Sequence, residues 1–148
     1  MRAVVDRQAQ TVVSHQTAMH LDTLDAFRQW RRDLVAEEQS RYVQGGCPLG
    51  SLGADLAESD PVGREQVAAG FRQWAGVIGA GLARMQQDGV LPRNVDTGQL
   101  ATGVLASLQG GLLMGQVERS AAPLDAALSA VITLLEGLAD RARDSAGR

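Results

Sequence analysis

The chain has 148 residues, of which 45% are hydrophobic and 21% charged, and its net charge is −3. This length fits one domain, and a chain of this size buries roughly 70% of its unfolded surface. The slight acidic excess argues against a domain that binds nucleic acid by itself, because such domains are usually basic. The single cysteine, Cys47, excludes an internal disulfide. Residues 1–10 lack the apolar core of a signal peptide, so we expect a soluble, cytoplasmic domain.

The composition favours an all-α fold. Aromatic residues make up only 3% of the chain, and no β-branched run is long enough for a strand. Apolar residues recur at steps of three and four over residues 2–19, which predicts a first amphipathic helix. Asp22 or Thr23 is placed to cap a second helix, which runs to about Tyr42.

Turn residues then set the boundaries of two further helices. The glycines and proline of residues 45–50 break the helical pattern, and Pro48 or Ser51 opens a short third helix. Asp60 is an N-cap acceptor with a proline at the next position, which predicts the start of a long fourth helix. The glycine at Gly89 predicts where that helix ends.

Two apolar helices end the chain. Asp96 caps a fifth helix, which continues to about Val117, and Pro123 opens the sixth. No charged residue lies between Gly98 and Val117, but the residues there are too polar and too small for a good membrane span, so we expect no membrane association. A helix that is apolar nearly all round must be covered all round, and a six-helix domain covers only one side of it.

We therefore infer that the last two helices pack against their own copies and form a two-fold, four-helix dimer interface. Small residues repeat every four positions along the fifth helix, which lets another helix approach closely. The alternative is that both helices form the core of a monomer. The interface residues that we expect are Leu108, Gly111, Leu112, Gly115, Leu124, Leu128, Val131, Leu135 and Leu138.

Three segments of the chain resemble a known protein family. They are the turn at residues 45–52, which reads GGCPLGSL, the helix start at residues 60–61, and residues 108–113, which read LQGGLL. Their order and spacing are similar to those of the C-terminal regulatory domain of TetR-family transcriptional repressors, in the subgroup that carries a GGCPLGSL-like turn. The resemblance covers essentially all of residues 1–148, which we treat as one effector-binding and dimerisation domain.

The resemblance implies a homodimer whose core takes a small, largely apolar effector. Complete members of the family begin with a helix-turn-helix domain, whose recognition helix enters the major groove of DNA. This sequence does not supply that domain, so we expect DNA contact only through a domain absent from the chain. The effector would release operator DNA by displacing the helix at residues 2–19. The alternative is a free-standing helical protein that binds a lipophilic small molecule or a partner helix.

The sequence offers no pattern typical of an enzyme or a metal site. Cys47 is a candidate reactive thiol, but no base lies at a recognisable spacing, and we favour a small apolar side chain that fills a turn. His15 and His20 lie five positions apart and so do not share a helix face. We expect no metal, no cofactor and no catalytic residue.

Four of the five aromatic residues lie in two identical tetrapeptides, FRQW, at residues 27–30 and 71–74. In each, the two rings are three positions apart and share a helix face. One interpretation is plain core packing, and the other is that the rings line an apolar cavity between the second and fourth helices. The effector-binding residues that we expect are Phe27, Trp30, Phe71, Trp74, Ile78, Met85, Leu105, Gln109 and Met114.

Overall fold

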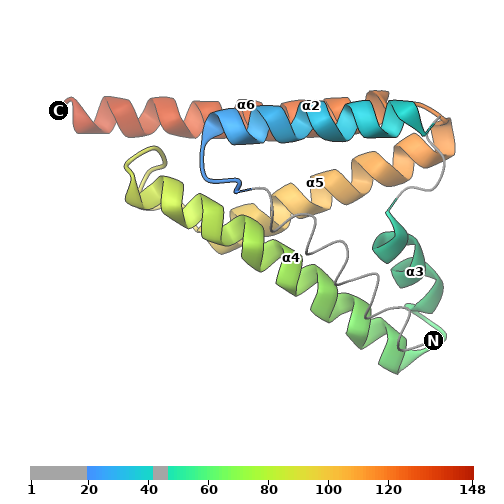
Figure 1. Cartoon of the computed structure of the whole chain (residues 1–148). Coiled ribbons are helices and arrows are strands. Elements are labelled where there is room, and N and C mark those ends of the chain that lie inside the picture. Colours follow the sequence, from blue (N-terminus) through green and yellow to red (C-terminus); the bar gives the residue numbers. More distant parts are fainter. Residues whose placement is uncertain (1–19, 42–46) are drawn as a thin grey trace.

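The computed structural model describes residues 20–41 and 47–148, and every regular element in these ranges is an α-helix (Figure 1). The all-α prediction is confirmed. The helix expected over residues 2–19 lies outside the described residues. The described helices are α2 (Leu24–Ser40), α3 (Pro48–Leu56), α4 (Pro61–Gln87), α5 (Thr97–Glu118) and α6 (Ala122–Ala146).

The predicted capping residues begin these helices. Thr23, Asp60 and Asp96 each accept a hydrogen bond from a backbone N–H of the first helical turn, at 3.0–3.1 Å. α4 is followed by Gly89, whose φ of +79° lies in the left-handed region that glycine adopts without steric cost. Local sequence signals therefore determine where α2, α4 and α5 begin and where α4 ends.

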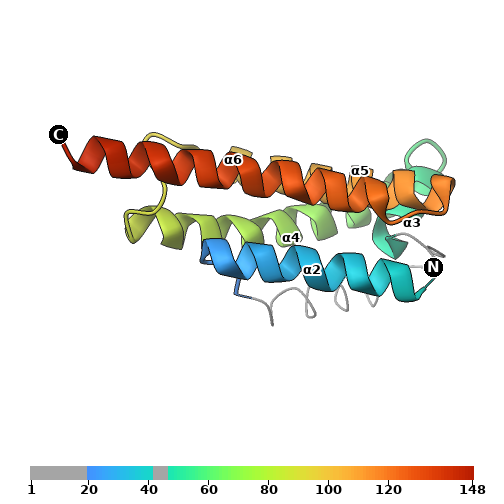
Figure 2. The same ribbon diagram turned by 90° about the horizontal axis from the view of Figure 1, so that it is seen from above.

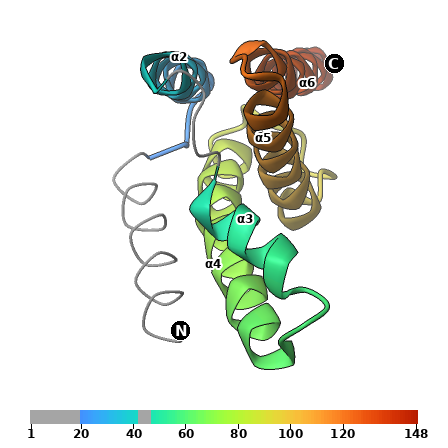
Figure 3. The same cartoon turned by 90° about the vertical axis from the view of Figure 1, so that its right-hand side faces the viewer.

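α5 occupies the centre of the described fold. It packs against both α4 and α6, while α3 packs against α4 and α5. Figure 2 shows α2 running beside α6, and Figure 3 shows these two helices as one layer, with α4 and α3 below them. The neighbour of α2 among the described helices is thus α6, and not α4 as expected.

The hydrophobic core lies where α4, α5 and α6 meet. Each of these helices contributes a stripe of buried apolar side chains, and full burial of one such side chain stabilises the fold by about 1.5–3 kcal/mol. α2 adds its two aromatic residues to the same core. The core includes Phe27, Trp30, Ile78, Leu82, Met85, Leu108, Leu124, Leu128 and Leu135, all of which are essentially inaccessible to solvent.

α2 is held against α6 by an apolar face with ion pairs at its edge. Phe27 and Trp30 meet edge to face, with ring centroids 5.9 Å apart. Arg28 on α2 donates hydrogen bonds of 3.2 and 2.8 Å to the Glu136 carboxylate on α6. A second ion pair, between Arg31 and Asp125, joins the same two helices. Because these ion pairs are part-exposed, solvent screens them, and the apolar contact dominates.

The segment before α2 crosses α4 at a glycine. A Cβ atom built on Gly81 would overlap the carbonyl oxygen of Leu21 and lie 2.7 Å from its carbonyl carbon. The absence of a side chain at Gly81 therefore lets the Leu21 backbone rest directly on α4. Leu21 is itself buried, so its side chain adds to this contact.

We expect Gly81→Ala to destabilise the fold by about 1–3 kcal/mol, because the new methyl group meets backbone atoms that cannot rotate away. Gly76→Ala is the matched control, since it lies on the same helix and its Cβ would meet nothing within 4 Å. The control is expected to gain up to about 1 kcal/mol from helix propensity. Urea unfolding followed by circular dichroism measures both changes, and equal stability changes in the two variants would contradict the crossing.

Glu38 is the one buried acidic residue among those that the structure describes, with 6% of its surface exposed. Burial raises the pKa of its carboxyl, and the nearby Arg41 only partly opposes this effect. Because the pKa is higher in the folded chain than in the unfolded chain, the folded chain binds this proton more tightly. Stability therefore falls as pH rises from the unfolded-state pKa through the folded-state pKa.

Glu38→Gln is accordingly expected to raise the melting temperature at neutral pH and to change it little at a pH where the carboxyl is protonated. Glu37→Gln is the control on the adjacent exposed carboxylate, which pairs with Arg41 at 2.5 Å. Loss of this exposed ion pair lowers the free energy of unfolding by at most about 0.5 kcal/mol. Thermal unfolding across this pH range distinguishes the two positions, and a Glu38→Gln melting temperature below wild type at neutral pH would refute the assignment.

Candidate functional site

A cavity of about 250 Å³ lies between α3, α4 and α5. The start of α3 forms one wall, the Phe71 ring on α4 forms another, and residues 109–116 of α5 form the third. Its lining residues are Cys47, Gly50, Ser51, Ala54, Phe71, Gln109, Gly110, Leu112, Leu113 and Gln116.

The amide of Gln109 joins α5 to the start of α3 at this cavity. Its Nε2 donates a hydrogen bond to the Cys47 Sγ at 3.5 Å. Its Oε1 lies so close to Gly50 that a Cβ there would be 2.5 Å away. Gly50 therefore makes room for the amide, and the glycine-rich turn predicted to break the helical pattern also shapes this wall.

The described lining of the cavity carries no charged side chain. Carbon atoms supply most of the wall, from Ala54, Phe71, Leu112 and Leu113. Amide groups and one hydroxyl supply the remainder. This composition is typical of small-molecule sites, in which an apolar wall carries a few polar groups that orient the ligand.

The structure brings only two of the expected effector-binding residues to the cavity, Phe71 and Gln109. Met114 is 53% exposed on the outer side of α5. The wall of this cavity opposite α4 comes from α3, whereas α2 contacts α6. The remaining expected residues are buried in the core: Phe27, Trp30, Trp74, Ile78, Met85 and Leu105.

Sequence reasoning missed most of the α3 wall. Gly50, Ser51 and Ala54 lie in or just after the GGCPLGSL turn, which was recognised as a family feature but not as part of a cavity. Their small side chains leave space without producing any hydrophobic periodicity. Cys47 is buried, which is compatible with a small apolar side chain that fills a turn.

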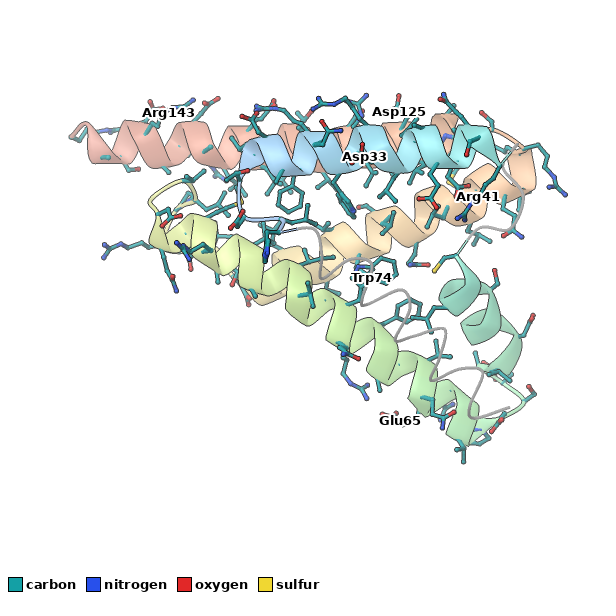
Figure 4. All side chains as sticks on the ribbon, viewed as in Figure 1. Asp33, Arg41, Glu65, Trp74, Asp125 and Arg143 are labelled. Carbon is teal, nitrogen blue, oxygen red and sulfur yellow. The ribbon has the colours of Figure 1, made fainter. Side chains whose placement is uncertain are left out.

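Trp74 lies on α4 one turn from the cavity wall at Phe71 (Figure 4). Its ring is buried with 3% of its surface exposed, and its Nε1 has no hydrogen-bond partner in the part of the chain that the structure describes. An unpaired buried donor is unfavourable, because it has lost its contact with water without a replacement. The indole is therefore positioned to report on changes in this part of the core.

The expected dimer residues lie inside the single chain. All nine are buried within the chain, where they pack α5 against α6 and α4. The close approach expected between copies occurs inside one chain, since a Cβ on Gly111 would lie 2.8 Å from the Leu124 Cα. The nine expected residues are Leu108, Gly111, Leu112, Gly115, Leu124, Leu128, Val131, Leu135 and Leu138.

The outer faces of α5 and α6 nevertheless expose large apolar side chains. Leu113, Met114 and Val117 on α5 are 62%, 53% and 76% exposed, and Leu134 on α6 is 51% exposed. We call these four residues the exposed apolar patch. Small uncharged residues continue the same outer faces along both helices: Thr102, Gly103, Ala106, Ala126, Ala130, Thr133 and Gly137.

Both α5 and α6 are long and apolar enough to cross a membrane by length and composition. From the sequence, however, α5 is expected to be a poor membrane span, because many of its residues are polar or have small side chains. In the structure, the apolar residues of these helices are divided between the core and the exposed apolar patch. Among the described residues, no group of three or more His, Cys, Asp or Glu side chains is arranged to hold a metal ion.

Comparison with known proteins identifies one family. Residues 21–131 match the family described as tetracyclin repressor-like, C-terminal domain. The chain is 30% identical over 90 residues to the HTH-type transcriptional repressor DhaR of Mycobacterium sp. (strain GP1). The aligned residues make up 61% of this chain and 46% of the relative. The chain thus spans about half the length of this curated relative.

The fold is similar to that of the crystal structure of regulatory protein TetR from Rhodobacter sphaeroides, with a TM-score of 0.80. The similarity covers 88% of this chain and 71% of the other, at 18% sequence identity. It supports the fold alone.

Proposed function

The chain belongs to the family of tetracyclin repressor-like C-terminal domains, and on this basis we propose that it senses a small effector and dimerises a transcriptional repressor. Transcriptional regulators of this family are not enzymes. They act as dimers that bind small-molecule effectors and DNA. We propose that residues 1–148 form one such domain, that it acts in the cytoplasm, and that DNA is bound by a helix-turn-helix domain joined to it.

The observation that carries the sensing proposal is the cavity between α3, α4 and α5. It is lined by uncharged, mostly apolar groups and lies against α4, the helix on which the Leu21 segment rests at Gly81. A ligand that separates α3 from α4 would shift α4 together with the chain that leads into α2. The size of this shift in population is limited by the difference in ligand affinity between the two conformations.

The exposed apolar patch supports the dimer proposal. Its four large side chains lie on the outer faces of the two helices that the sequence assigned to the dimer. Packing two copies through these faces would form a four-helix interface with two-fold symmetry. Such a dimer fixes the distance between two attached recognition helices, and therefore the spacing of the operator half-sites.

For the dimer, we expect Val117→Arg to convert the protein into a monomer, because the interface would bury an unpaired charge at a cost of several kcal/mol. Val62→Arg is the matched control, since this valine is 54% exposed near the start of α4, outside the patch. Sedimentation equilibrium at micromolar concentration measures both. A monomeric wild type, or equal dissociation of both variants, would refute the assignment of the interface.

For sensing, we expect millimolar acetophenone, a small neutral probe, to raise the melting temperature of the wild type through preferential binding to the folded state. Gly110→Leu and Ala54→Leu are expected to abolish this increase by filling the cavity from α5 and from α3. A Cβ on Gly110 meets nothing within 4 Å, so the helix accepts the new side chain.

Gly76→Leu is the control for these variants, because its Cβ also meets open space but lies on α4 away from the cavity. It should retain the acetophenone response. Sedimentation of each variant checks that the dimer persists. If both cavity-filling variants respond like the control, the cavity is not where the probe binds.

A further inference from the structure

We infer that the cavity selects uncharged ligands that carry a hydrogen-bond acceptor, and that Gln109 is the residue that determines this selectivity. The inference rests on the proposed sensing function and adds to it the chemical class of the effector. Gln109 is suited to this role by its half-buried position on α5, where its amide forms part of the cavity wall.

The size of the cavity limits the ligand. An engineered apolar cavity of about 150 Å³ holds benzene, and drug-sized ligands need about 300 Å³ or more. The volume of about 250 Å³ lies between these values. A single substituted six-membered ring, or an aliphatic chain of similar bulk, fits this space.

The wall disfavours a charged ligand. None of its described residues is acidic or basic, so an anion or cation that left water here would find no opposite charge. An unpaired ion in such surroundings is penalised by the full loss of its hydration, whereas a neutral polar group loses far less. An adjoining hollow, which shares Gly50, Ala54 and Phe71 with the cavity, includes the exposed Arg64, but Arg64 does not line the cavity itself.

The Gln109 amide has a donor available for a ligand. Among the described residues, its Nε2 donates to the Cys47 Sγ alone, at 3.5 Å, and a thiol sulfur is a weak acceptor. A carbonyl oxygen that enters the cavity would form a stronger hydrogen bond with this N–H than the sulfur does. The Oε1 end lies against Gly50, where the missing side chain leaves room for the amide.

The test compares three molecules of matched shape: acetophenone, which is neutral with a carbonyl acceptor, benzoate, which is anionic, and isopropylbenzene, which has neither feature. Dissociation constants are measured by NMR titration of the intact chain at neutral pH. We expect acetophenone to bind about fivefold more tightly than isopropylbenzene and at least about a hundredfold more tightly than benzoate. Benzoate should bind better once the pH is low enough to protonate it.

Gln109→Leu and Gln109→Met should remove the preference for acetophenone over isopropylbenzene while retaining the discrimination against benzoate. Gln116→Leu is the control, because it alters another amide of the same cavity whose Nε2 has no contact with Cys47 among the described hydrogen bonds. It should leave the preference unchanged. The wild-type series tests the ligand class without any variant, and the two Gln109 variants test the role of this residue.

The outcomes separate this inference from the proposed function. If benzoate binds at neutral pH as tightly as acetophenone, the ligand class is wrong. If Gln116→Leu and Gln109→Leu have equal effects, Gln109 does not determine the selectivity. In both cases the cavity remains a binding site. If none of the three molecules binds at millimolar concentration, the sensing role of the cavity fails and this inference fails with it.

Discussion

The need to cover α5 determines how the rest of the structure is arranged. Between Gly98 and Val117 this helix has no charged residue, so no side of it is strongly solvated. α4 and α6 bury two of its sides, and α3 packs near a third beside the cavity. The outer side, with Leu113, Met114 and Val117, stays uncovered within one chain. In the proposed dimer, a second copy would cover this side with an apolar surface of its own.

Leu113 belongs both to the wall of the cavity and to the exposed apolar patch. In the proposed dimer, a partner that covers the patch therefore changes the surroundings of a ligand in the cavity. In the proposed dimer, binding of a ligand and binding of a partner are linked through this side chain. Such linkage is reciprocal, so each binding event alters the free energy of the other by the same amount.

The sequence predicts local features of this fold well, because caps, prolines and glycines act on their own turn. Thr23, Asp60 and Asp96 needed no knowledge of the tertiary structure. The neighbour of α2 could not be predicted in this way. The sequence pattern shows that the face around Phe27 is apolar, but it does not show whether that face packs against α4 or α6. Likewise, periodicity cannot tell which of two apolar faces of α5 is internal, so Gly111 was assigned to the dimer although it contacts α6. The α3 wall was missed because small residues define space and leave no pattern.

The position of the cavity beside α4 makes this helix the natural route from ligand to the N-terminal part of the chain. α4 is a continuous helix of 27 residues, and packed helices move as units because interiors are close-packed. Phe71 contacts the cavity and Gly81 carries the Leu21 backbone, so the two contacts lie on one rigid element. Side chains at the Gly81 crossing cannot absorb a shift of α4, because the contact is formed by backbone atoms. In the proposed sensing function, a displacement of α4 at Phe71 would therefore reach Leu21 through backbone contact, without a flexible side chain in between.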